Sequence, residues 1–208
     1  MAAPVEHLPT IAIALALAWA SGIRLYAVLF ALGLAGYVQW PGWALPSSMS
    51  LLAHPVVLTS TGLLLVTEFF ADKIPGFDTL WDAIHTFIRI PGGALLAAGI
   101  IASEDGAAWA LAAGLLGGTI TAGTHFLKAG GRAAINTSPE PLSNWTASFG
   151  EEALVVAGLW LAYQYPVMFL AGLVLFMLLV AWMLPKLWRL GIRMMRFLFA
   201  RAANAPAA

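Results

Sequence analysis

Cysteine is absent from this chain of 208 residues, and charged residues make up only 10% of it. Without cysteine the chain can form neither disulfides nor thiolate metal sites, and it has no cysteine nucleophile. Soluble domains carry about 25% charged residues, so an ordinary water-exposed surface is excluded. Ten Lys and Arg residues balance ten Asp and Glu residues, which gives no overall bias toward nucleic acid or acidic partners.

Apolar residues are abundant instead, at 61% of the chain, with a mean hydropathy of +0.86. This hydrophobicity also excludes a disordered chain. A transmembrane helix needs about 20 mostly apolar residues, and the apolar runs lack the alternation that is typical of strands. The sequence therefore predicts an all-α integral membrane protein, a single polytopic domain over residues 1–208. About six spans are expected: 8–38, 51–71, 91–103 (from 79 if the preceding segment joins it), 106–127, 147–163 and 166–185.

The basic residues indicate how these spans are oriented. If the N-terminus lies inside, nine of the ten Lys and Arg residues fall in the segments after the second, fourth and sixth spans. The tenth, Arg24, lies within the first span, and the loops on the other side contain none. The positive-inside rule then predicts that both termini are cytoplasmic. Residues 186–201 follow the last span as a basic amphipathic tail, which predicts contact with anionic lipid.

Two segments of the first and fourth spans are alike. Residues 21–26 (SGIRLY) and 122–127 (AGTHFL) each have a small residue, a glycine and then a basic side chain two positions later. If the halves 8–103 and 106–185 are repeats of three spans, the second is inverted, as in many transporters whose sites lie at broken helices. Gly22 and Gly123 would then mark breaks in the first and fourth spans. The alternatives are coincidence between Ala- and Gly-rich helices and simple close packing.

Ionisable residues lie within the predicted spans. Arg24 is near the centre of the first span, where an arginine costs about 2.5–3.5 kcal/mol unless it has a partner or a wet cavity. Glu68 in the second span is its nearest predicted counter-ion, and His125 lies deep in the fourth. Salt bridges that merely join helix ends are the alternative explanation. The candidate substrate or ion pathway consists of Arg24, Glu68, His125, Lys128, Arg132 and Glu151.

A polar stripe precedes the third span. Its members recur at i, i+4, i+7 and i+11 and therefore share one helical face: Asp78, Asp82, His85 and Arg89. The plain interpretation is an amphipathic helix along the membrane interface, anchored by Trp81. In the alternative, Asp78, Asp82 and His85 bind a cation or line an access path.

Several of these motifs resemble one family. They are EFFADKIPGFD at 68–78, WD at 81–82, RIPGG at 89–93 and HFLK at 125–128, with Arg132, Ser138-Pro139, Ser143-Asn144 and Glu151. The set is similar to an uncharacterised bacterial membrane family, domain-of-unknown-function family 4126. The resemblance covers nearly the whole chain. It implies a small multi-span protein of the inner (plasma) membrane and brings no established activity.

The preferred functional hypothesis is a small transporter or channel for an anionic solute or a lipid headgroup. Arg24 with Lys128 and Arg132 suits an anionic group, and Glu68 and His125 could carry protons. The alternative is a structural or assembly protein whose polar groups lock helices together. A metal-dependent intramembrane enzyme ranks last, because no complete nucleophile–base set and no His-Glu-x-x-His motif is present.

The expected partners follow from the same hypothesis. They are membrane lipids, a small anion or phosphate-bearing ligand, and a second copy of the chain, since glycine-rich helices allow a homodimer. Neither nucleic acid nor a cofactor is expected.

Overall fold

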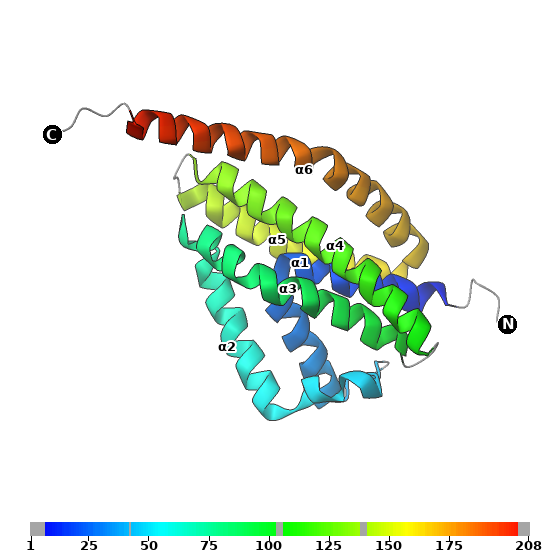
Figure 1. The fold of residues 1–208 in the computed structure, drawn as a ribbon. Helices are drawn as coiled ribbons and strands as arrows, with labels where there is room; N and C mark the ends of the chain where they lie inside the picture. The colour runs from blue at the N-terminus through cyan, green and yellow to red at the C-terminus, as the bar shows by residue number, and fades with distance from the viewer. Residues whose placement is uncertain (1–6, 42, 103–105, 138–140, 204–208) are drawn as a thin grey trace.

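The computed structural model describes residues 7–41, 43–102, 106–137 and 141–203, and within these ranges the chain is helical with no strand (Figure 1). The predicted all-α class is therefore confirmed. Six α-helices and one short 3₁₀ helix follow one another along the chain: α1 Leu8–Tyr37, η1 Ser47–Ala53, α2 Pro55–Ala71, α3 Phe77–Ala102, α4 Ala107–Ile135, α5 Pro141–Gln164 and α6 Pro166–Ala203.

Four helices are long and apolar enough to cross a membrane, namely α1, α3, α4 and the Pro166–Lys186 part of α6. The helices η1 and α2 meet at 68° and pass the same test only as one bent pair, which raises the number to as many as five. Within the described ranges α5 is not among them, because its first half carries Asn144, Ser148, Glu151 and Glu152. The chain is thus a multi-pass membrane protein, and a count of six spans stays a prediction.

The helix α1 is broken at its middle. Arg24 has non-helical backbone angles, φ −141° and ψ 70°, and Figure 1 shows the second half of α1 turning toward η1 and α2. Backbone groups freed at such a break must find partners within the protein or in water. The Lys128 ammonium meets part of this need by donating to the Ile23 carbonyl at 3.1 Å. The first span therefore has the predicted break, two residues beyond Gly22.

Both glycines of the repeat-like segments serve close packing. A Cβ on Gly22 would lie 2.7 Å from the carbonyl oxygen of Thr121. A Cβ on Gly123 would lie 3.1 Å from the terminal carbon of Met177, so α6 packs there. The helix α4 is continuous through Gly123, and the predicted break in the fourth span is wrong. The inverted repeat itself stays a prediction.

Replacing Gly22 with alanine is expected to lower the free energy of unfolding by about 1–3 kcal/mol, because a backbone oxygen cannot swing away from the added methyl group. Thermal unfolding in detergent, followed by tryptophan fluorescence, measures the change. Gly150→Ala is the matched control, since Gly150 is an exposed helical glycine with nothing near its missing Cβ. That control should become slightly more stable through helix propensity. Equal melting temperatures for the two variants would contradict close packing at Gly22.

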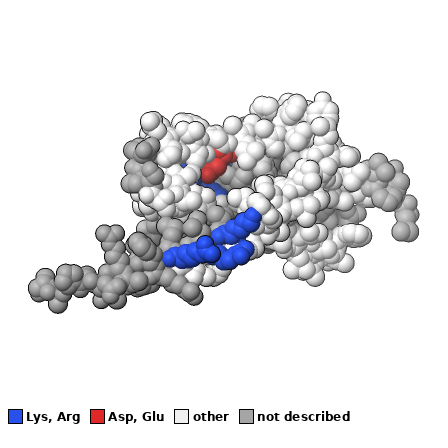
Figure 2. Space-filling view, turned by 90° about the horizontal axis from the view of Figure 1, so that it is seen from above, with Lys and Arg blue, Asp and Glu red and all other residues white. Residues whose placement is uncertain are grey.

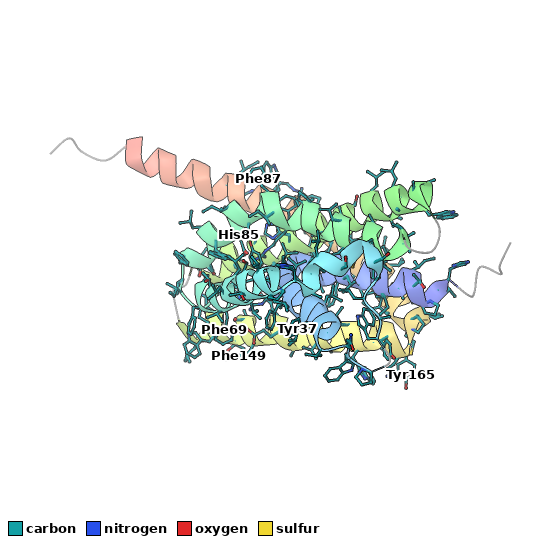
Figure 3. All side chains as sticks on the ribbon, turned by 90° about the horizontal axis from the view of Figure 1, so that it is seen from below. Tyr37, Phe69, His85, Phe87, Phe149 and Tyr165 are labelled. Carbon is teal, nitrogen blue, oxygen red and sulfur yellow. The ribbon has the colours of Figure 1, made fainter. Side chains whose placement is uncertain are left out.

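The helix α3 includes the segment before residue 91, as in the alternative in which the third span begins near residue 79. The predicted interfacial helix and the predicted third span form one helix of 26 residues that contains Pro91. Its outer side carries exposed apolar residues such as Phe87, which is 82% exposed and points outward in Figure 3. A polar face in a membrane protein is stabilised by partners in the interior, and here the stripe packs against other helices; the location of this segment at the membrane interface stays a prediction. The polar stripe is buried: Asp78, Asp82, His85 and Arg89.

The predicted basic tail is a continuation of α6, which runs through Pro185 to Ala203. Figure 2 shows basic side chains gathered on one face of the molecule, and Lys186, Arg189 and Arg193 are exposed on α6. Contact of this face with anionic lipid stays a prediction. The side chains of Arg196 and Arg201, and the residues Ser138 and Pro139, lie outside the described part of the chain.

Candidate functional site: a buried charge network at the break in α1

Ten charged side chains from five parts of the chain form one connected set of ion pairs, here called the charge network. Five cations balance five carboxylates, so the charge network is formally neutral. Glu151 and Glu152 are 17% and 33% exposed at their side chains, while the other members are buried. The members are Arg24 of α1, Glu68 of α2, Asp72 and Lys73 just beyond α2, Asp82 and Arg89 of α3, Lys128 and Arg132 of α4, and Glu151 and Glu152 of α5.

Asp72 lies at the centre of the charge network. One of its carboxylate oxygens is 2.6 Å from the Arg24 guanidinium and accepts from the Lys128 ammonium at 2.9 Å. Burial alone would raise the pKa of the Asp72 carboxyl, but Lys128 and Arg24 together hold that pKa below its usual value. The sequence predicted Glu68 as the partner of Arg24. That pairing is wrong, because Asp72 lies one helical turn further along and reaches the break in α1.

Arg132 joins α4 to α5 through a bidentate ion pair with Glu151. Its guanidinium donates from two nitrogens to the two oxygens of Glu151, at 3.0 and 2.9 Å. Its third nitrogen donates to the backbone carbonyls of Asp72 and Asn144, at 2.8 and 3.1 Å. Such bidentate, charge-assisted bonds are the strong and geometrically specific ones. Arg132 therefore fixes the position of α5 and of the chain after α2.

A second buried pair joins α2 to α3. The Arg89 guanidinium donates to Glu68 and lies 3.0 Å from Asp82, and all three side chains are at most 1% exposed. Arg89 also approaches the Nδ1 of His125 at 3.4 Å. Since arginine only donates, Nδ1 accepts, which places the ring proton of a neutral His125 on Nε2. That nitrogen lies 2.7 Å from the hydroxyl of Thr86.

Glu152 and Lys73 form the outer end of the charge network. The Lys73 ammonium lies 3.8 Å from Glu152, donates to the Ser148 hydroxyl at 3.1 Å, and sits 3.1 Å from the centre of the Phe69 ring. The ring centre of Phe149 of α5 lies 4.7 Å from the same ammonium, and Figure 3 shows the two phenylalanines near one another. Burial lowers the pKa of Lys73 despite the carboxylate of Glu152. Figure 2 shows a small acidic patch on the face that also carries the basic side chains.

The predicted cation site does not form. Asp78 accepts from the backbone amide of Thr79 at 2.6 Å and from the Asn136 side chain at 2.8 Å, while Asp82 faces Arg89. His85 stacks on Trp81 with ring centres 3.9 Å apart. Within the described residues no group of three His, Asp or Glu side chains could hold a metal ion. These side chains are therefore not arranged around a common cation position, and their alternative role along an access path stays a prediction.

A pocket of about 440 Å³ lies beside the charge network, between α1, α2 and α5. Arg24 and Glu152 form its polar end, and the rest of its wall is apolar: Ala27, Leu65, Val66, Phe69, Phe70, Val155 and Val156. Its volume falls in the range of small-molecule sites, about 300–1,000 Å³. The charge network therefore reaches a space that a ligand could occupy.

The structure brings together all six predicted pathway residues. Five are members of the charge network, and His125 touches it through Arg89. The sequence interpretation missed Ser148, and it gave no site role to Asp72 or to Asn144, which it named only in the family resemblance. A polar stripe on α5 carried the signal, since Asn144, Ser148 and Glu151 recur at spacings of four and three and so share one helical face.

Comparisons with known proteins identify a family without an activity. A family model described as "Domain of unknown function (DUF4126)" matches residues 11–186. No curated protein and no solved structure matches the chain. The function therefore has to be argued from the charge network and the pocket.

Proposed function

Because the chain belongs to the DUF4126 family, whose description names no activity, we propose from the site itself that it is a small membrane transporter or channel for an anionic solute or lipid headgroup. The observation that carries the proposal is Arg24. It lies at the break of a predicted span, is 2% exposed, and lines the pocket. Broken helices beside a lined cavity are where many transporters bind their substrates.

The neutrality of the charge network sets a condition on such binding. An anion that entered alone would leave the buried site with an uncompensated negative charge, which is costly in a low-dielectric interior. A proton bound together with the anion keeps the site neutral. Glu152 is the most exposed carboxylate of the charge network and lies 3.5 Å from Arg24, so an anion that arrives beside Arg24 meets its negative charge. We therefore propose that anion and proton move together.

Uptake of radiolabelled inorganic phosphate and glycerol 3-phosphate into proteoliposomes tests this proposal. Acidifying the outside should stimulate wild-type uptake of at least one of the two. Arg24→Ala should reduce uptake about thirtyfold or more, because truncating one partner of a buried charged hydrogen bond costs about 2–5 kcal/mol. Glu152→Gln leaves the charge network with one excess positive charge, so an anion no longer needs a proton bound with it and the stimulation by acid should be lost. The fold should stay intact, because this side chain is 33% exposed.

Arg189→Ala is the matched control, because Arg189 is exposed on α6, outside the charge network. Its uptake should equal that of the wild type. A wild-type protein that takes up neither anion under any imposed pH gradient would contradict the proposal. So would undiminished uptake by a folded Arg24→Ala variant.

A structural role is the second candidate, and the pairing within the charge network favours it. Every cation of the network lies within ion-pair distance of a carboxylate, so the network joins α1, α3, α4, α5 and the end of α2 without any ligand. Variants that lose stability while the protein shows no uptake would favour this role. In either case we propose that both termini face the cytoplasm and that the protein lies in the inner membrane.

A further inference from the structure

Most of the wall of the pocket is apolar, and Arg24 and Glu152 give it one polar end. Apart from Arg24 and Glu152, its lining is made of aliphatic and phenylalanine side chains from α1, α2 and α5. A polar solute pressed against such a wall loses its hydration without gaining hydrogen bonds. Most of the pocket is therefore shaped for an apolar chain.

The pocket opens onto apolar outer surface of α2 and α5. Three of its lining residues are also exposed on the outside of α2 and α5: Val66 at 54%, Phe70 at 59% and Val156 at 69%. Large exposed apolar surface on a multi-pass membrane protein is covered by lipid tails. An occupant can therefore reach the pocket sideways from the bilayer.

The polar end of the pocket is formed by Arg24 and Glu152. One terminal nitrogen of the Arg24 guanidinium donates to the Ser148 hydroxyl at 2.8 Å and lies 3.4 and 3.5 Å from Glu151 and Glu152. An occupant whose polar part lies at this end meets charged groups there, while its apolar part lies against the rest of the wall.

The charges next to the pocket fit a zwitterionic headgroup, which carries one positive and one negative charge. The Lys73 ammonium and the Glu152 carboxylate lie 3.8 Å apart at the outer end of the charge network, and the charge network as a whole is neutral. A singly charged anionic headgroup would be attracted by Lys73 and repelled by Glu152. A phosphate and an ammonium on one headgroup would match both.

We propose that the pocket binds one acyl chain of a zwitterionic phospholipid. The chain lies along Leu65, Val66 and Val156, and its ester group lies at the end of the pocket that Arg24 and Glu152 form. The phosphate lies near Lys73 and the headgroup ammonium near Glu152. This inference goes beyond the proposed function, because a bound lipid requires no transport.

Photo-crosslinking in vesicles tests the inference. The protein is reconstituted into equal parts of phosphatidylethanolamine and phosphatidylglycerol, with a trace of phosphatidylethanolamine that carries a diazirine on one acyl chain. Adducts located by mass spectrometry should concentrate on 65–70 of α2 and 155–156 of α5. Val156→Trp fills the pocket and should lower this labelling about tenfold, because overpacked sites lose affinity steeply.

The matched control is Val174→Trp, since Val174 is 61% exposed on α6 and does not line the pocket. Labelling of the pocket in this variant should equal that of the wild type. Adducts spread over all lipid-facing helices, or labelling unchanged by Val156→Trp, would overturn the inference. Displacement of the probe by free palmitate but not by unlabelled phosphatidylethanolamine would also overturn it, since a fatty acid would then be the occupant.

Discussion

Replacing Asp72 with asparagine is expected to destabilise the protein by about 3–5 kcal/mol, which is the usual cost of removing one partner of a buried ion pair. One oxygen of Asp72 serves both Arg24 and Lys128. Asparagine keeps the size of the side chain and removes its charge, so two buried cations lose their nearest carboxylate. Glu151, which lies 3.4 Å from Arg24 and 3.7 Å from Lys128, compensates only in part.

The thermal midpoint in detergent should fall by about 10 °C for a loss of this size. Glu152→Gln is the matched control, because it removes one carboxylate of the same charge network at a side chain that is 33% exposed. Partly exposed pairs contribute at most about 1 kcal/mol, so its midpoint should change little. Equal shifts for the two variants would show that Asp72 is not the centre of the charge network.

Acid should remove the difference in stability between the wild type and the Asp72→Asn variant. The pKa of Asp72 is lowered in the folded protein, so its carboxylate contributes stability above the unfolded-state pKa of about 3.9. That contribution is lost as the pH falls through the lower folded-state value. The difference in midpoint should therefore be full at neutral pH and shrink below about pH 3.9. A difference that grows on acidification would contradict the assigned role of Asp72.

The helical architecture could be predicted because apolar runs in a membrane leave few alternatives. Strands need partners for every backbone group, and the runs lack their alternation. Helix boundaries were harder to predict. Pro91 and Pro185 both suggested ends, yet α3 and α6 continue through them, because neighbouring groups in a membrane protein can satisfy the freed carbonyls. Gly123 suggested a break, whereas the structure uses it for contact with α6.

The charge network could be predicted only in part, because an amphipathic pattern shows that a polar face exists and not where it points. The stripe at Asp78, Asp82, His85 and Arg89 has the same spacing whether it lies at the interface or inside the bundle. The sequence also could not show which carboxylate pairs with Arg24. Glu68 and Asp72 lie one turn apart on one helical face, and the position of the break in α1 decides which of them meets Arg24.

The pair of Arg89 and Glu68 should show strong coupling in a double-mutant cycle. Arg89→Met alone is expected to cost about 3–5 kcal/mol, because it leaves the fully buried Glu68 without a counter-ion. Glu68→Met alone should cost a similar amount. Both side chains are 0% exposed, so water cannot replace either partner. Denaturation by a graded detergent series, followed by tryptophan fluorescence, measures all four proteins.

The double variant should lose less free energy of unfolding than the two single variants lose together. Two apolar side chains of similar volume then fill the same space, and no unpaired charge remains. Asp82 keeps Lys128 as a partner at 3.5 Å when Arg89 is absent, so the second deletion does not isolate another carboxylate. Strict additivity would mean that Arg89 is held by Asp82 and His125 rather than by Glu68. A double variant that also kept anion uptake would show that this pair stabilises the bundle, and that transport depends on the part of the charge network around Arg24.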